Sequence, residues 1–224
     1  MTAPALTREF VDASSTPAVR GFIHTPARAN SRGIVLTHGA GANCQSPLLT
    51  AVGRAFADSG IIVLRCDLPF RQQRPHGPPS RGGAANDREG LRRAVEALKA
   101  ANPGLERIFV GGHSYGGRQA SMLAAELPKL AAGLLLLSYP LHPPRKPAEL
   151  RTGHFPQLTT AALFIHGSRD PFGLPEEMRA ALGLIPARNL LVEIAGAGHE
   201  LRAKNSGGGD VSGHIVDAFL GFFP

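Results

Sequence analysis

The pentapeptide Gly112-His113-Ser114-Tyr115-Gly116 constrains the fold of this chain more than any other feature of its sequence. An apolar run, Ile108-Phe109-Val110, precedes it, and an alanine-rich segment follows it to about Leu127. Gly-x-Ser-x-Gly between a strand and a helix is typical of a sharp turn, because the glycines let the two elements approach closely. Such a turn lifts the Ser114 hydroxyl clear of the sheet. The sequence therefore predicts a nucleophilic serine at this position.

Strand-like and helix-like segments alternate on both sides of that turn, which is typical of the α/β class with a mostly parallel, twisted sheet and helices on both faces. Two short alternating segments at the start predict an antiparallel hairpin at the sheet edge. The arginine-, proline- and glycine-rich segment over residues 70–85 predicts a loop. Because we find no internal repeat or linker, we expect a single domain over residues 1–224. The hairpin covers residues 8–13 and 19–25; the other predicted strands cover 33–37, 61–64, 107–110, 133–138, 162–165 and 190–194, and the helices 47–59, 86–100, 115–127, 175–184 and 212–222.

Composition and charge narrow the functional classes. The chain is 43% hydrophobic and 18% charged, as in ordinary globular proteins. Its net charge is +7, but the arginines, densest between Arg65 and Arg93, accompany no nucleic-acid-binding motif. We therefore expect a solvated basic face rather than a nucleic-acid partner. The sequence leaves open a homo-oligomer or a protein partner.

The cysteine content and the apolar runs bear on the compartment. Cys44 and Cys66 are the only cysteines, too few for a disulfide framework. No apolar run reaches the ~18 residues of a membrane-spanning helix, and the N-terminus lacks the basic start and apolar core of a secretory signal. These features predict a cytoplasmic protein without a membrane anchor.

A serine nucleophile needs a base, and the base needs a carboxylate to orient it. Asp170 follows the predicted strand 162–165, and His199 follows the strand 190–194 through a glycine-containing loop. Ser114, Asp170 and His199 thus occur in the order serine, acid, histidine, each after a later strand. Asp67 is the rival acid, but its strand precedes Ser114, so we expect it to anchor the arginine-rich loop. His214 is the rival base, on the predicted last helix.

Backbone N–H groups near the serine should bind a developing oxyanion. The N–H of Tyr115 is the first candidate, and the N–H of Ala40, in the turn His38-Gly39-Ala40-Gly41 after an early strand, is the second. These positions all lie at carboxyl ends of strands, where open α/β sheets bind ligands.

Several further side chains are candidates for contact with a substrate: His38, His113, Tyr139 and His142. The flanking glycines offer another explanation for the positions of His38 and His113, and His142 is alternatively an ordinary loop histidine. A metal cluster would need helical histidine pairs or cysteine spacing, and neither occurs. We therefore predict no metal and no cofactor.

The chain resembles the α/β-hydrolase superfamily over almost its whole length. The segments Leu36–Gly41, Asp67–Phe70, Gly111–Arg118, Ser138–Pro144, His166–Gly173 and Gly198–Leu201 are similar to the α/β-hydrolase-like domain shared by testis-expressed protein 30 and a subunit of the NSL acetyltransferase complex. That resemblance implies the fold and an intact triad but no substrate. The chain also resembles the dienelactone hydrolases, more loosely. These enzymes use a cysteine nucleophile, whereas this chain has Ser114 at that position.

Together these observations predict a serine hydrolase that acts through an acyl-enzyme on a small or medium ester-like substrate. The interval over residues 139–160 is too short for a helical lid of several elements, so we expect a minimal cap or none, with an open site bordered by the segments 70–85 and 139–144. The alternative is a non-catalytic interaction module that keeps the hydrolase fold.

Overall fold

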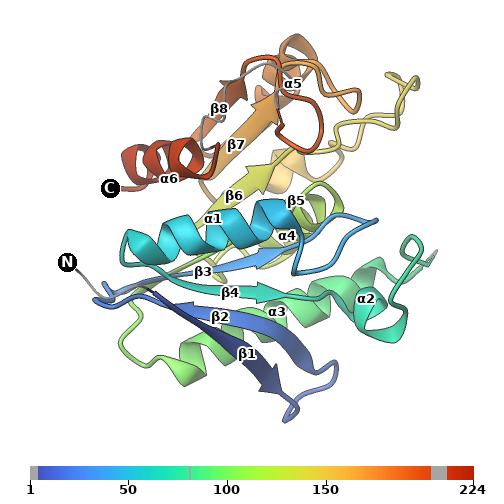
Figure 1. The fold of residues 1–224 in the computed structure, drawn as a ribbon. Coiled ribbons are helices and arrows are strands. Elements are labelled where there is room, and N and C mark those ends of the chain that lie inside the picture. Colours follow the sequence, from blue (N-terminus) through green and yellow to red (C-terminus); the bar gives the residue numbers. More distant parts are fainter. Residues whose placement is uncertain (1–4, 81, 203–210) are drawn as a thin grey trace.

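The computed structural model describes residues 5–80, 82–202 and 211–224. Within them the chain forms one eight-stranded sheet in the order β1-β2-β4-β3-β5-β6-β7-β8, as Figure 1 shows. The strands are β1 (Leu6–Asp12), β2 (Val19–Thr25), β3 (Arg32–Thr37), β4 (Ile62–Cys66), β5 (Arg107–His113), β6 (Gly133–Leu137), β7 (Ala162–Gly167) and β8 (Asn189–Ile194). The helices are α1 (Pro47–Asp58), α2 (Pro69–Gln73), α3 (Ala84–Ala101), α4 (Tyr115–Glu126), α5 (Pro175–Leu182) and α6 (Val211–Phe222), with a 3-10 turn, η1 (Phe155–Gln157).

The first two strands form the predicted antiparallel hairpin. β1 pairs with β2, and β2 pairs antiparallel with β4. All remaining neighbours are parallel, from β4 through β3, β5, β6 and β7 to β8. The carboxyl ends of these parallel strands therefore lie at one edge of the sheet, where loops from distant parts of the sequence meet.

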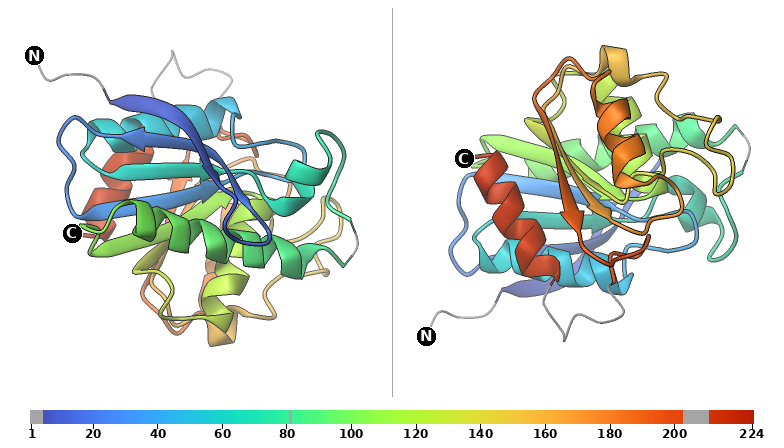
Figure 2. Two further views of the ribbon diagram at one scale, coloured as in Figure 1. Left: turned by 90° about the horizontal axis from the view of Figure 1, so that it is seen from below. Right: turned by 90° about the horizontal axis from the view of Figure 1, so that it is seen from above.

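Two apolar cores lie on opposite faces of the sheet. Side chains of α1 and α6 build the core on one face, and side chains of α3, α4 and α5 build the core on the other. Figure 2 shows this three-layer arrangement from both sides. The central strands β4 and β6 are buried along their whole length, which explains their nearly continuous apolar sequences.

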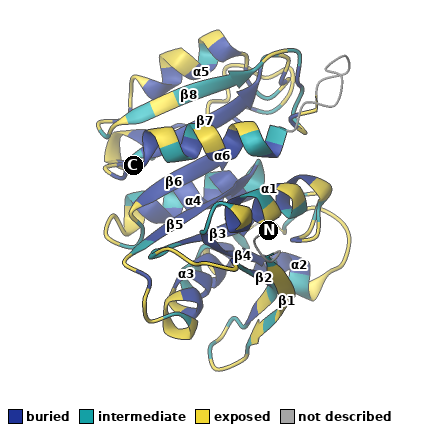
Figure 3. Ribbon diagram, turned by 60° about the vertical axis from the view of Figure 1, so that its left-hand side comes forward, coloured by how far each residue is buried: buried dark blue, intermediate teal, exposed yellow. Residues whose placement is uncertain are grey.

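The sheet edges are more exposed. In Figure 3 the central strands are mostly dark blue, whereas β1 and β8 carry exposed positions. Leu6 and Val11 on β1 are 63% and 57% exposed, and Leu190 on β8 is 43% exposed. The alternating, partly polar sequence of β1 fits this edge position.

The segment after β4 differs from its prediction. We expected a loop over residues 70–85, but residues 69–73 form α2, and α3 begins at Ala84. Pro69 is compatible with the first helical position, where no N–H is needed. The carboxylate of Asp87 accepts the N–H of Phe70 at 3.0 Å, which satisfies a donor at the start of the short helix. The loop prediction was wrong there because this partner is distant in sequence.

The connection between β6 and β7 carries no cap domain. Residues 138–161 contain one regular element, the single turn η1, and otherwise run as an irregular connection. The predicted α/β-hydrolase fold without a substantial cap is thus confirmed. In the parts of the chain that the structure describes, no helix combines the length and apolar character needed to span a membrane.

Candidate active site

Ser114 occupies a strained turn between β5 and α4. Its backbone has φ 50° and ψ −116°, a left-handed conformation that costs energy for a residue with a side chain. The neighbouring glycines make the turn sterically feasible. A Cβ on Gly112 would lie 2.4 Å from the carbonyl oxygen of Thr37, and a Cβ on Gly116 would lie 2.6 Å from that of His38. The sequence pattern thus reflects close contact between this turn and the end of β3.

Ser114, His199 and Asp170 form a continuous hydrogen-bonded chain. The Nε2 atom of His199 lies 2.8 Å from Ser114 Oγ, and its Nδ1 atom lies 2.8 Å from Asp170 Oδ2. Asp170 is fully buried, whereas the His199 side chain is 16% exposed. With Nδ1–H donated to the carboxylate, Nε2 is free to accept a proton from the serine hydroxyl.

The carboxylate of Asp170 is held by its own loop. Its second oxygen accepts the backbone N–H of Phe172 at 2.9 Å. The buried ring of His166 lies beside it, with Nε2 2.7 Å from the carbonyl oxygen of Gly173 and 3.7 Å from Asp170 Oδ2. These contacts fix the orientation of the carboxylate toward His199.

Two aromatic rings border the His199 imidazole. The Phe172 ring stacks on it with centroids 4.2 Å apart and an interplanar angle of 32°. The His113 ring lies 5.1 Å away, and its Nε2 atom donates to the backbone carbonyl of His199 at 2.8 Å. Sequence reasoning missed Phe172, although it is the second residue after the predicted acid and shares its turn.

The predicted oxyanion donors lie on both sides of Ser114. Tyr115 is the first residue of α4, so its N–H has no intrahelical acceptor. The N–H of Ala40 donates to none of the described residues. The turn containing Ala40 approaches the serine closely, because a Cβ on Gly39 would lie 3.4 Å from Ser114 Cβ.

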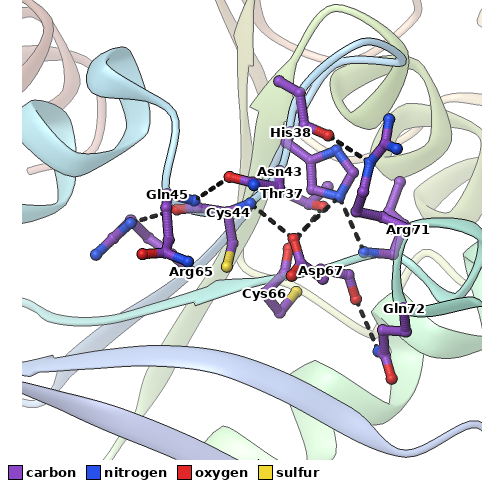
Figure 4. Close-up of polar contacts among 12 residues, drawn as sticks. Thr37, His38, Asn43, Cys44, Gln45, Arg65, Cys66, Asp67, Arg71 and Gln72 are labelled. Atoms are coloured by element: carbon purple, nitrogen blue, oxygen red, sulfur yellow. Dashed lines mark hydrogen bonds and ion pairs between the residues drawn. The ribbon is translucent and has the colours of Figure 1, made fainter. Parts of the chain in front are cut away.

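His38 and Asp67 support that turn from behind. His38 is fully buried, and its Nε2 atom accepts the N–H of Leu68 at 3.1 Å, so its Nδ1–H donates to the Gly39 carbonyl at 2.9 Å. Burial lowers the pKa of His38, which keeps the ring neutral. Asp67 Oδ1 accepts the N–H of Cys44 at 2.7 Å (Figure 4). The Asp67 carboxylate therefore anchors the turn after β3, and its backbone carbonyl accepts the side-chain N–H of Gln72, in the arginine-rich segment after β4, at 2.9 Å.

The candidate substrate-contacting side chains are engaged by the protein itself. His38 is fully buried within the turn that contains Ala40, and His113 is 5% exposed. Tyr139 is fully buried and donates its hydroxyl to the carbonyl of Arg151 at 2.6 Å. His142 is 5% exposed, with its ring nitrogens near Pro143 O and Glu177 Oε2. The rival base His214 lies in the first turn of α6 and is exposed, and the imidazole that lies within reach of Ser114 Oγ is that of His199.

The histidines near Ser114 raise the question of a metal ion at this edge of the sheet. Over the described ranges, no three histidine, cysteine, aspartate or glutamate side chains gather in a way that could hold a metal ion. The buried histidines around Ser114 each bond to backbone carbonyl or amide groups, which accounts for their positions without a ligand.

The sheet order, the strained serine turn and the placement of acid and base on later loops define a protein of the α/β-hydrolase class. A family model described as an alpha/beta hydrolase domain matches residues 30–220, so the chain belongs to that family.

Solved structures share the fold at low sequence identity. A dienelactone hydrolase from Anabaena variabilis has a TM-score of 0.75 and 21% identity, over 98% of this chain and 99% of its own. A serine hydrolase without a lid from Xanthomonas campestris has a TM-score of 0.71 and 17% identity, over 100% and 97%. Est1E from Butyrivibrio proteoclasticus has a TM-score of 0.73 and 16% identity, over 98% of each chain.

Proposed function

We propose that this protein is a serine hydrolase that cleaves small or medium ester-like carbonyl substrates through an acyl-enzyme. The observation that carries the proposal is the imidazole of His199, which lies 2.8 Å from both Ser114 Oγ and Asp170 Oδ2. That geometry meets the requirement for a nucleophile, a general base and an orienting carboxylate within hydrogen-bond reach.

The chemistry proceeds in two steps. His199 takes the Ser114 proton as Oγ attacks the substrate carbonyl, and the N–H groups of Ala40 and Tyr115 bind the oxyanion. The tetrahedral intermediate collapses, His199 gives the proton to the departing alcohol, and the acyl group stays on Ser114. Water, deprotonated by His199, then attacks the acyl-enzyme; as the second tetrahedral intermediate collapses, His199 returns the proton to Ser114 Oγ and the acid is released. Each oxyanion donor is expected to stabilise the transition state by about 3 kcal/mol.

The short connection between β6 and β7 bears on substrate size. Because no cap follows β6, we expect the loops after β4 and β6 to border the site, which favours a small or medium ester, thioester or amide. A hydrolase fold that serves only as an interaction module would not need the hydrogen-bonded serine, histidine and aspartate. We therefore favour the enzyme over that alternative.

We further propose that the protein is a single-domain cytoplasmic enzyme. A single sheet receives strands from β1 to β8, which supports one domain over the chain. Cys44 and Cys66 are free thiols, as expected in the cytoplasm. The segments shared with testis-expressed protein 30 support placement in that branch of the family.

A fluorophosphonate probe tests the proposal, with the labelled site mapped by mass spectrometry. Wild type should label at Ser114 alone, Ser114→Ala should not label, and His199→Ala should label at least about 100-fold more slowly because the base is lost. A panel of p-nitrophenyl esters should show the same dependence. Folded wild type that neither labels nor hydrolyses any ester would overturn the proposal and favour the interaction module.

A further inference from the structure

The guanidinium of Arg71, on α2, is buried and donates to backbone carbonyls alone. Arg71 is 5% exposed. Its Nε atom lies 2.7 Å from the Ala42 carbonyl oxygen, and its Nη2 atom lies 2.8 Å from that of Ala40. Nη2 also donates to Gly77 at 3.0 Å, and Nη1 to Arg74 at 3.1 Å. The planar fork of donors thus holds two carbonyls of the oxyanion turn, residues 38–45, in one orientation.

This use of an arginine is unusual for a buried cation. Buried charges are normally paired with an opposite charge, but Arg71 forms no ion pair with any residue in the described ranges. Its ring contact is with Phe70, whose centroid lies 4.9 Å from the guanidinium carbon. Carbonyl dipoles therefore replace the missing carboxylate. The guanidinium thus donates to the carbonyls of Ala40 and Ala42 in the turn and to those of Arg74 and Gly77 outside it.

Bonds from His38 and Arg71 together restrict the two peptide groups on either side of Ala40. The Gly39 carbonyl accepts from the N–H of Ala42 at 3.1 Å and from His38 Nδ1. In a trans peptide the N–H points opposite to the carbonyl, so a fixed Gly39 carbonyl directs the Ala40 N–H away from His38. Arg71 fixes the next carbonyl, that of Ala40, and thereby prevents rotation of this residue. Figure 4 shows the His38 ring and Arg71 beside the same turn.

Helix α2 also contacts Tyr115, which carries the other candidate oxyanion donor. The Phe70 ring packs edge-on against the Tyr115 ring with centroids 5.7 Å apart. The buried carboxylate of Asp87 joins the same two residues, accepting the Phe70 N–H at 3.0 Å and the Tyr115 hydroxyl at 2.7 Å. The helix that carries Arg71 is therefore fixed relative to the start of α4, where the Tyr115 N–H lies.

We propose that Arg71 is a positioning residue that aims the Ala40 N–H at the oxyanion by clamping the carbonyls of Ala40 and Ala42. The inference rests on the proposed serine hydrolase function. Arg71 touches no reacting atom, so its effect is on the transition state, where the oxyanion charge develops, and not on ground-state binding.

The test compares Arg71→Ala and Arg71→Lys with a matched control. Arg71→Lys keeps the buried stem and the positive charge but loses the fork. The control is Arg74→Ala, an exposed arginine in the same segment whose side chain donates to Pro78 at 2.9 Å and not to the oxyanion turn. The readouts are kcat and KM for a p-nitrophenyl ester and the affinity for a trifluoromethyl ketone, which forms a tetrahedral adduct with the serine.

Loss of the clamp should lower kcat about 100-fold in Arg71→Ala and about tenfold in Arg71→Lys, with KM changed less than about threefold. Affinity for the ketone should fall in proportion to kcat, and guanidinium ion should restore part of the activity of Arg71→Ala alone. A merely structural role would lower thermal stability without changing the kcat of the folded fraction.

Three outcomes separate the hypotheses. Wild-type kcat in folded Arg71→Ala, or an increase in KM alone, would overturn the role of Arg71 while the hydrolase proposal stands. If Arg71→Ala does not fold, Arg71→Lys provides the test. A kcat and a ketone affinity equal to those of wild type in Arg71→Lys would then overturn the role of Arg71. Wild type with no Ser114-dependent turnover or probe labelling would overturn both proposals.

Discussion

The Nε2 atom of His113 lies 2.8 Å from the backbone carbonyl oxygen of His199, so the residue before the candidate nucleophile bonds to the residue that carries the candidate base. Burial lowers the pKa of His113, and the neutral ring uses its one N–H for this bond. The contact joins the turn after β5 to the loop after β8. It therefore fixes the distance over which the Ser114 proton would be transferred.

Substitution of His113 tests this coupling. His113→Phe removes the hydrogen-bond donor but keeps a ring. We expect kcat for ester hydrolysis to fall about 10- to 100-fold, because His199 is no longer held in position relative to Ser114. His113→Gln, which retains a donor, should lose less. His76→Phe on an exposed segment is the control. Equal kcat in His113→Phe and wild type would show that the contact has no role in catalysis.

Gly116→Ala should destabilise the protein, whereas Gly104→Ala should be tolerated. A Cβ at position 116 would lie 2.6 Å from the His38 carbonyl oxygen and 2.7 Å from Thr37 Cγ2, but a Cβ at position 104 has no neighbour within 4 Å. We expect a loss of about 2 kcal/mol or more in the free energy of unfolding for Gly116→Ala, measured by urea denaturation. A Gly116→Ala midpoint equal to that of wild type would contradict the close packing of α4 on β3.

The two thiols should be unreactive in the folded protein. Both cysteines are buried; burial raises the pKa of Cys44 to about 12 and also raises that of Cys66. Since the thiolate is the reactive form, a thiol reagent at pH 8 should modify neither residue until the chain is unfolded. Activity should therefore survive iodoacetamide and be lost with a fluorophosphonate. Inactivation by the thiol reagent would instead indicate a cysteine nucleophile.

Stability should fall as the pH is lowered from about 6.5 to about 4. Burial, with the charges of Arg65 and Arg54, lowers the pKa of His24 to about 4 from 6.5. Its Nε2 accepts the Arg65 Nε–H at 2.7 Å, which requires the neutral ring. In this window the unfolded chain binds a proton that the folded chain does not, so acidification favours unfolding.

The size of that effect can be isolated with His24→Gln, which still offers Arg65 an acceptor. Wild type should lose about 2 kcal/mol more than the variant between pH 6.5 and pH 4, measured by urea unfolding at several pH values. His154, with its pKa also lowered to about 4 by burial and by Arg118 and Arg88, contributes equally to both proteins. Parallel pH profiles for the two proteins would refute the assignment to His24.

The sequence alone determined the class of the fold and the order of the candidate catalytic groups. Continuous apolar runs predicted the central parallel strands, because a strand buried on both faces is apolar at every position. Alternating segments predicted the hairpin, because a strand buried on one face is apolar at every second position. The glycines around Ser114 indicated that α4 packs closely against β3. Periodicity and turn chemistry depend on residues that are adjacent in the chain, so both can be predicted from the sequence.

The tertiary structure alone decided how the surrounding side chains are used. Helix α2 was not predicted, because its segment is rich in residues that end helices. Its stabilising partner, Asp87, is distant in sequence from Pro69. The arginines around residue 71 read as a solvated face, yet Arg71 is buried against the oxyanion turn. His38 and Tyr139 read as substrate contacts, yet both point inward. Such roles depend on which groups come into contact in the folded protein. A hydrogen bond between residues distant in sequence produces no periodic pattern in the sequence from which it could be predicted.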